Sequence, residues 1–142
     1  MKNEGLKARA PITIHVDGAC KGNPGPASIG AVIRTRDGET LKSLSEYIGH
    51  ATNNIAEYLA LIFALQEAVS MAAKDVEVYT DSQLMARQFS GEYKVKEPHI
   101  RVLQRIVKQL TRYFDRCEVR HIPREENRDA DLLANRAIEE HV

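Results

Sequence analysis

The most constraining feature of the sequence is an apolar, alanine-rich segment with helical periodicity, flanked by two short segments of alternating polarity. In residues 54–72 large apolar side chains recur at helical spacing, and four alanines fill another side of the same helix. Residues 12–16 and 76–79 alternate apolar and polar side chains, which is typical of half-buried strands. The order strand, long helix, strand predicts a β-α-β unit in which the two strands lie parallel.

The remaining segments extend this unit into a mixed sheet. Residues 29–35 and 40–48 read as strands on either side of Asp37-Gly38, a strong hairpin signal. A short helix through about residue 89, a polar connector at 90–98, a second long helix, a strand at 117–122 and a last helix follow. The order βββαβ(αα)βα predicts one α/β domain over residues 1–142, with three antiparallel strands, then two parallel ones. Residues 1–11 are polar and are expected to form a flexible N-terminal extension.

The zero net charge of the 142-residue chain conceals a strong asymmetry. Residues 17–81 carry nine acidic against five basic side chains and residues 125–142 six against two, whereas residues 82–124 carry ten basic against four acidic. Such asymmetry hints at an anionic or metal-dependent partner. No apolar run is long enough for a membrane helix, and the start of the chain has no secretory signal. With only two cysteines, the sequence suggests a cytoplasmic protein with reduced thiols.

Four acidic residues fall at the ends of predicted elements. Asp17 and Asp81 end strands one and four, whereas Glu57 and Asp131 lie in the first turns of two helices. If the two strands are parallel neighbours, their acids meet at the carboxyl edge of the sheet, where open α/β sheets commonly bind ligands. Clustered carboxylates repel one another unless cations neutralise them, and all-oxygen sites suit Mg²⁺ or Mn²⁺.

Each acid also has a structural explanation. Asp81 or Ser82 could cap the short helix, and Glu57 could be the glutamate of a capping box opened at Asn54. Asp131 could be a first-turn acid favoured by the helix dipole. The set of four, together with the loops around it, favours a shared site.

Four linked segments resemble type 1 ribonuclease H. They are D-G-A-C-K-G-N-P-G-P at residues 17–26, A-T-N-N-I-A-E at 51–57, V-Y-T-D-S-Q at 78–83 and H-I-P-R-E-E-N-R-D-A-D-L-L-A-N-R-A at 121–137. Their order and spacing match the family across residues 12–138. The resemblance implies a ribonuclease H-like fold in its compact form, because the chain has no tryptophan and residues 90–98 are too short for the basic protrusion of some relatives.

The resemblance also implies a metal-dependent endoribonuclease that hydrolyses the RNA strand of RNA–DNA hybrids, leaving 3′-hydroxyl and 5′-phosphate ends. By position, Asp17 would bridge two Mg²⁺ ions, for which Mn²⁺ could substitute. Glu57 and Asp81 would complete the ion on the leaving-group side, and Asp131 the ion that activates the attacking water. Some compact relatives also cleave double-stranded RNA or RNA–DNA junctions, so these remain further expected substrates.

Other residues are assigned by the same resemblance. His121 would assist proton transfer or product release, and Asn23, Asn53 and Asn54 would contact ribose 2′-hydroxyls and base edges. Thr52 matches a contact to a phosphate of the DNA strand. With no protrusion, hybrid binding would depend on Lys94, Lys96 and a basic stripe along the second long helix. The protein is expected to act as a monomer.

Two other functions remain open from the sequence. One is a DNA nuclease of the integrase or resolvase type on the same scaffold, although the N-P-G-P and T-N-N segments argue against it. The other is a catalytically silent nucleic-acid-binding module, which would normally have lost one or more of the four acids.

Overall fold

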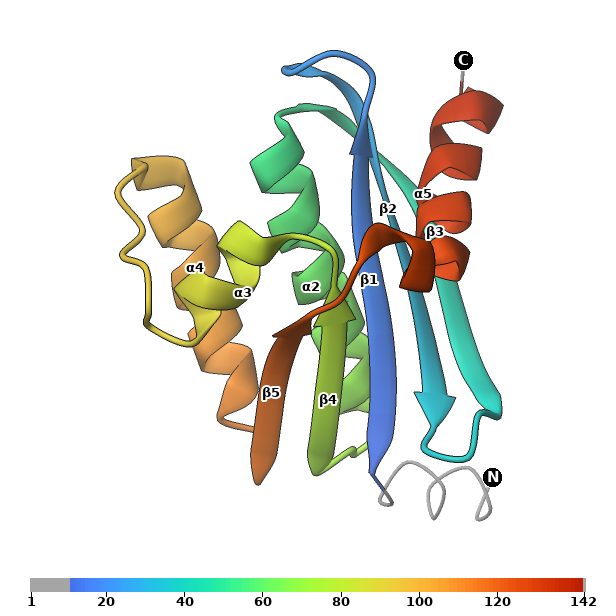
Figure 1. The fold of residues 1–142 in the computed structure, drawn as a ribbon, viewed down its shortest axis with the longest axis vertical. Coiled ribbons are helices and arrows are strands. Elements are labelled where there is room, and N and C mark those ends of the chain that lie inside the picture. Colours follow the sequence, from blue (N-terminus) through green and yellow to red (C-terminus); the bar gives the residue numbers. More distant parts are fainter. Residues whose placement is uncertain (1–10, 142) are drawn as a thin grey trace.

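The computed structural model describes residues 11–141, which form a five-stranded mixed sheet (Figure 1). The strand order is β3-β2-β1-β4-β5. β1 and β2 pair antiparallel, as do β2 and β3, whereas β4 lies parallel to both β1 and β5. The predicted sheet of three antiparallel and two parallel strands is therefore confirmed. The strands are β1 Ile12–Cys20, β2 Gly25–Thr35, β3 Thr40–Ala51, β4 Asp75–Thr80 and β5 Arg116–His121.

Helices cover the two faces of the sheet unequally. α2 packs on β1 and β2, and α4 packs on α2 from outside. α5 lies on the opposite face, against β1, β2 and β3 (Figure 1). The helices are α2 Asn53–Ser70, α3 Gln83–Phe89, α4 Pro98–Thr111 and α5 Arg128–His141, with a short 3-10 helix, η1, at Arg124–Glu126.

The apolar composition of α2 follows from its position between two layers. Its alanines at 56, 60, 64 and 68 are fully buried, and their small size allows neighbouring backbones to approach. Tyr58 is also buried, and its hydroxyl donates a 2.6 Å hydrogen bond to Oε1 of Gln88 on α3. The sheet covers the helix on one side, and α3 and α4 cover it on others. This burial explains why its sequence is apolar and rich in alanine.

Two glycines of the sheet allow the helices to touch it. A Cβ placed on Gly30 would lie 2.2 Å from the carbonyl oxygen of Ala130 and 2.5 Å from the amide nitrogen of Ala134, both on α5. A Cβ on Gly18 would lie 2.5 Å from the carbonyl carbon of Ala56 on α2. A side chain at either position would force the facing helix backbone to shift, which is costly because backbone atoms cannot move aside as a flexible side chain can.

Some boundaries differ from the sequence prediction. β1 continues past Asp17 to Cys20, because β2 begins earlier than predicted and pairs with it as far as Ala27. α2 ends at Ser70, two residues early, and Ala72 adopts φ 60. Residues 1–10 of the predicted extension lie outside the described residues. Within 11–141 no helix is both long and apolar enough to cross a membrane.

Replacing Gly30 by alanine is expected to destabilise the fold, because the added methyl group would push α5 away from the sheet. Overpacking of this kind costs roughly 1 to 3 kcal/mol, which lowers the melting temperature by about 3 to 10 °C. Thermal unfolding followed by circular dichroism measures the effect. Ser43→Ala, an exposed change on β3, is the control. Equal melting temperatures for Gly30→Ala and the control would contradict the tight contact.

Candidate active site

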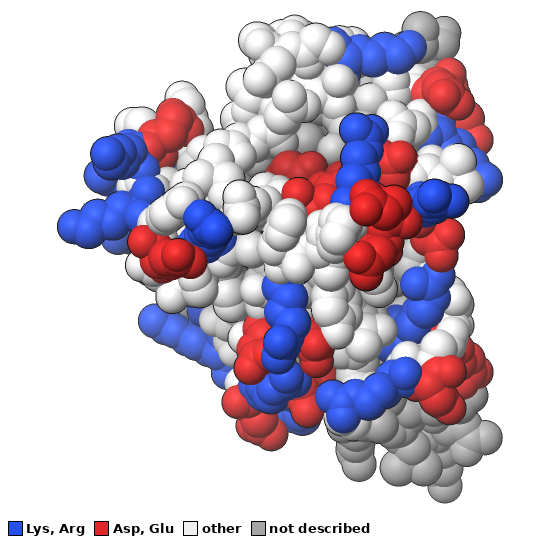
Figure 2. Space-filling model, viewed as in Figure 1, with Lys and Arg blue, Asp and Glu red and all other residues white. Residues whose placement is uncertain are grey.

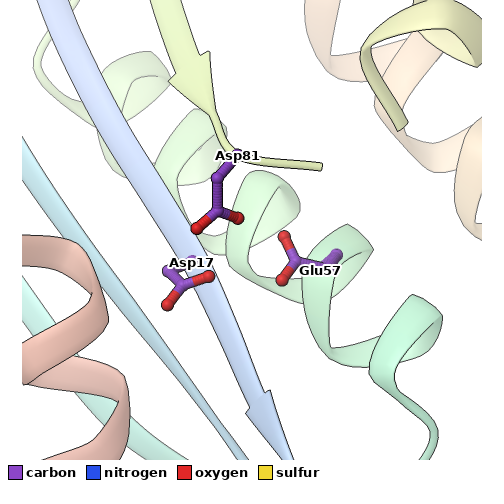
Figure 3. Close-up of side chains that lie close together, drawn as sticks. All are labelled: Asp17, Glu57 and Asp81. Carbon is purple, nitrogen blue, oxygen red and sulfur yellow. The ribbon is translucent and has the colours of Figure 1, made fainter. Parts of the chain in front are cut away.

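Three carboxylates from distant parts of the chain converge where β4 ends beside β1 (Figure 3). Asp17 lies on β1, Glu57 on α2, and Asp81 directly after β4. One carboxylate oxygen from each lies within 4.8 Å of the others, a grouping that could hold a metal ion. The predicted meeting of Asp17 and Asp81 is confirmed, and Glu57 joins them from the helical layer.

The register of the parallel strands accounts for the first pair. Val16 and Thr80 are the last residues of β1 and β4 in register, so Asp17 and Asp81 are the next residue of each chain. The prediction that Asp17 ends its strand was wrong, since β1 goes on with β2 as its partner. The parallel pairing of β1 with β4 ends at Val16, one residue before Asp17, and this places the two acids side by side.

Gly18 positions the third acid. Because it has no side chain, α2 approaches β1 so closely that a Cβ on Gly18 would lie 2.6 Å from the amide nitrogen of Glu57. The Gly18 N–H donates a 3.1 Å hydrogen bond to Oε1 of Glu57. Oε2 of Glu57 is buried and has no hydrogen-bond partner within residues 11–141, which leaves it free to bind a cation.

The helix-cap explanations for Glu57 and Asp81 were wrong. α2 is capped by Thr52, whose Oγ1 accepts a 3.2 Å hydrogen bond from the Ile55 N–H, and its first turn holds no acid. Glu57 therefore lies one turn further on and cannot complete a capping box. α3 is capped by Ser82, not by Asp81. Both carboxylates are thus available for another role.

Asp131 approaches the same site from the opposite face of the sheet. It lies in the first turn of α5, as predicted, and lines a cleft of about 410 Å³ with the other three acids. Asn135 Nδ2 donates a 3.1 Å hydrogen bond to Asp131 Oδ1, and Arg124 Nη2 lies 3.7 Å from the same oxygen. Asp131 is outside the tight group of three but shares their cleft.

The site concentrates negative charge in a poorly hydrated place. Asp17 is only 4% exposed. Burial, followed by the charges of Glu57 and Asp81, raises its pKa far above 3.8. Burial and the charge of Asp81 likewise raise the pKa of Glu57. An all-oxygen donor set with one unpartnered buried oxygen fits a hard divalent cation, which would relieve this repulsion.

The predicted substrate-binding residues of the first loops form a second hollow beside the acids. Asn23, Thr52, Asn53 and Asn54 line it together with residues at the start of α4, and its volume is about 530 Å³. Asn53 also lines the acidic cleft, so the two hollows are adjacent. Oδ1 of Asn23 accepts a 3.0 Å hydrogen bond from the Asn53 N–H, which fixes the loop against the helix start.

Lys94, Lys96 and His121 are absent from the lining of both hollows. The two lysines are exposed on the segment before α4, and Lys and Arg side chains project from the side of the molecule that carries this helix (Figure 2). Acidic side chains lie in the middle of the same face (Figure 2). His121 ends β5 beside Thr80 and is exposed, and it is absent from the lining of the acidic cleft.

Sequence reasoning missed several residues of the cleft. Arg124 and Asn135 line it, and Asn127 is buried beneath it. Asn135 could have been found, because it follows Asp131 by one helical turn. Arg124 had no such signal, since its loop gave no periodicity. Cys20 is half-buried and also lines the cleft.

Comparison with known proteins shows which family has this sequence and fold. Residues 15–137 match the family described as reverse transcriptase-like. A ribonuclease HI of Halobacterium salinarum is 40% identical over 129 residues, or 91% of this chain. The crystal structure of the ribonuclease H1 from this organism matches with a TM-score of 0.90 and 39% identity, over 92% of this chain and 99% of that one. The chain belongs to the type 1 ribonuclease H family.

Two further family members are similar in sequence or structure. LC11-RNase H1, whose crystal structure is a complex with an RNA/DNA hybrid, is 43% identical with a TM-score of 0.88, over 92% of this chain and 98% of that one. A bifunctional protein of Mycobacterium tuberculosis is 43% identical over 129 residues, or 90% of this chain. The chain spans 65% of the length of the curated Halobacterium relative and 35% of the mycobacterial one.

The Asp17→Asn variant is expected to be more stable than the native ribonuclease H domain when metal is absent. A carboxyl group whose folded-state pKa is raised contributes stability below its ordinary pKa, near 3.8, and this is lost as the pH rises. The gain should therefore be small at about pH 4 and reach roughly 1 to 3 kcal/mol by about pH 8. Thermal unfolding in EDTA across this range measures it.

Asp115→Asn is the matched control, because Asp115 is an exposed acid outside the cleft. Its melting temperature should follow that of the native protein at every pH. A difference between Asp17→Asn and the native protein that does not grow with pH would refute the electrostatic explanation.

Proposed function

We propose that this protein is a metal-dependent endoribonuclease that hydrolyses the RNA strand of RNA–DNA hybrids, leaving 3′-hydroxyl and 5′-phosphate ends. The observation that carries the proposal is the convergence of Asp17, Glu57 and Asp81 within 4.8 Å, with Asp131 lining the same cleft. A family member 43% identical to this chain has been crystallised with an RNA/DNA hybrid, which supports the substrate class.

The donor set favours Mg²⁺, with Mn²⁺ as a substitute, because both prefer carboxylate oxygens. Asp17, Glu57 and Asp81 would hold one ion, and Asp131 with Asp17 would hold a second. When bound, such ions lower the pKa of a water molecule and neutralise the charge that develops on the leaving oxygen. The protein then needs no covalent nucleophile of its own.

Neighbouring groups hold the carboxylates in place for this role. The Gly18 N–H engages one oxygen of Glu57 and leaves the other free. The Asn135 amide holds Oδ1 of Asp131 in the same way from the next turn of α5. Because each fixed carboxylate keeps an orientation before any ligand arrives, less conformational entropy is lost on binding.

Recognition of the RNA strand is assigned to the amides beside the cleft. Asn53 lines both hollows and is held through its backbone by Asn23, so its side chain lies where a strand entering the acidic cleft would pass. An amide can donate to and accept from a 2′-hydroxyl, the group that distinguishes RNA from DNA. Asn54 and Thr52 would contact the strands in the second hollow, and Lys94 and Lys96 would contact phosphates. Double-stranded RNA remains an additional proposed substrate.

Arg124 is proposed to contact a substrate phosphate at the mouth of the cleft. Its side chain is 78% exposed, and its guanidinium lies 3.7 Å from Oδ1 of Asp131. Its charge also opposes the burial that raises the pKa of Asp81. An exposed guanidinium over an acidic cleft can pair with the anionic substrate as it enters. The proton-transfer role of His121 stays a prediction, as do the cytoplasmic location and the monomeric state.

Asp17→Asn and Asp81→Asn are each expected to abolish cleavage of an RNA–DNA hybrid in Mg²⁺ or Mn²⁺ while leaving the fold intact. The physical reason is the loss of one charged oxygen ligand from a small all-oxygen site. A gel assay of cleavage with circular dichroism of each variant makes the measurement. Retained cleavage in a carefully purified variant would overturn the site assignment.

The substrate class is tested on one gel with four duplexes: RNA/DNA, RNA/RNA, DNA/DNA and DNA with a single ribonucleotide. The proposal expects the RNA strand of RNA/DNA to be cut most efficiently, with any RNA/RNA cleavage weaker. Preferential cutting of DNA/DNA would favour a DNA nuclease and contradict the proposal.

Arg124→Ala is expected to reduce kcat/KM on the hybrid by about 10-fold or more, because a charge-assisted contact to phosphate contributes roughly 1.5 to 3 kcal/mol. Steady-state kinetics at several salt concentrations measures it, and Arg124→Lys should recover part of the loss. Arg36→Ala, an exposed change between β2 and β3 outside the cleft lining, serves as the control and should leave kcat/KM unchanged. If Arg124→Ala leaves kcat/KM unchanged at every salt concentration, the phosphate contact does not exist.

A further inference from the structure

Asn127 is a buried polar residue directly beneath the acidic cleft. It lies between η1 and α5 and is only 1% exposed. Its Nδ2 donates a 2.9 Å hydrogen bond to the backbone oxygen of Val16, which is 111 positions away in the chain. A buried asparagine is retained at a cost unless its polar atoms find partners, so this contact calls for an explanation.

The Val16 carbonyl lies where the parallel ladder stops. Val16 is the last residue of β1 in register with β4, and the β4 chain leaves the sheet at Asp81. A buried carbonyl without a donor costs roughly 1 to 3 kcal/mol. The Asn127 side chain supplies a donor at this point, so the ladder can end here and Asp81 can turn into the cleft.

Asn127 also lies close to two of the four acids of the cleft, Asp81 and Asp131. Its side chain lies beside the Asp81 carboxylate and favours the charged form, which opposes the burial that raises the pKa of Asp81. Its backbone oxygen accepts a 3.1 Å hydrogen bond from the Asp131 N–H. Since Val16 O and the Asp81 carboxylate are both acceptors, the NH₂ group of the amide must face them. Oδ1 remains buried with no protein partner among residues 11–141.

We propose that Asn127 is a positioning residue that sets the placement of Asp17, Asp81 and Asp131 relative to one another and thereby the affinity of the site for divalent cations. Its side chain reaches Asp17 through the preceding residue, Val16, and lies beside Asp81, while its backbone oxygen makes the helical hydrogen bond to Asp131. The inference rests on the proposed function, because it concerns the same metal site. Residues that orient metal ligands typically contribute 10- to 100-fold to metal affinity.

A purely structural role is the competing explanation, and the chain offers a matched control for it. Ser28 on β2 is fully buried, and its Oγ donates to the backbone oxygen of Ala134 on α5. Ser28 and Asn127 both fasten the α5 region to the sheet. Only Asn127 contacts the acids, so only its loss should change metal binding specifically.

The test compares the full chain with its Asn127→Ala and Ser28→Ala variants. Mn²⁺ binding is measured by isothermal titration calorimetry without substrate, thermal unfolding is measured in EDTA, and hybrid cleavage is measured as a function of Mg²⁺ concentration. Both variants are expected to unfold at lower temperature. Asn127→Ala should raise the Mn²⁺ Kd about 10- to 100-fold and shift half-saturation by Mg²⁺ in the same direction. Ser28→Ala should keep both values within about two-fold of the native protein.

Equal Mn²⁺ affinity and Mg²⁺ dependence in Asn127→Ala and the native protein would overturn the proposal. So would an equal loss in the Ser28→Ala variant, which would indicate a general effect of loosening α5. If Asn127→Ala does not fold, Asn127→Ser, which keeps one hydroxyl donor, carries the same comparison with a smaller expected loss. A native protein that neither binds Mn²⁺ nor cleaves the hybrid would contradict the proposed function itself.

Discussion

The mutual repulsion of Asp17, Glu57 and Asp81 is the constraint on which the rest of the structure depends. Burial raises the pKa of all three carboxyl groups, and the charges of neighbouring carboxylates raise it further. A flexible scaffold would relieve the strain by letting them separate. Here the sheet and α2 hold them together. The fold therefore provides stability elsewhere that offsets the cost of the site.

The alternation of side chains along a strand explains how two consecutive residues of β1, Asp17 and Gly18, face different helices. Asp17 pairs with Gly30, whose missing side chain faces α5, and residues opposite each other in a sheet share a face. The next residue, Gly18, faces α2 and admits Glu57. Asp17 therefore faces the side of the sheet covered by α5, and Gly18 faces the side covered by α2. The apolar core, which runs along β1, β4 and α2, keeps this arrangement rigid.

Much of the fold and the acid positions could be predicted from the sequence, because both follow from periodicity. Alternation at residues 12–16 and 76–79 gave the central parallel pair, and the register of that pair brought Asp17 beside Asp81. The capping explanation for Glu57 failed because it assumed a helix start at Asn54, whereas Thr52 caps the helix. Asn127 and Arg124 could not be predicted as part of the site, since their contacts join the loop after β5 to groups distant in sequence. No local pattern encodes such contacts.

The link between Asn127 and Val16 also bears on how the protein matures. It joins the first strand to the last helical region, and Asp131 comes later still. During synthesis, a chain that has left the ribosome only as far as β5 would carry three of the acids but neither the asparagine nor the fourth acid. Long-range contacts of this kind form late in folding, because the intervening loop must first be ordered. A partly made chain would thus lack the complete acidic site until its last helix docks.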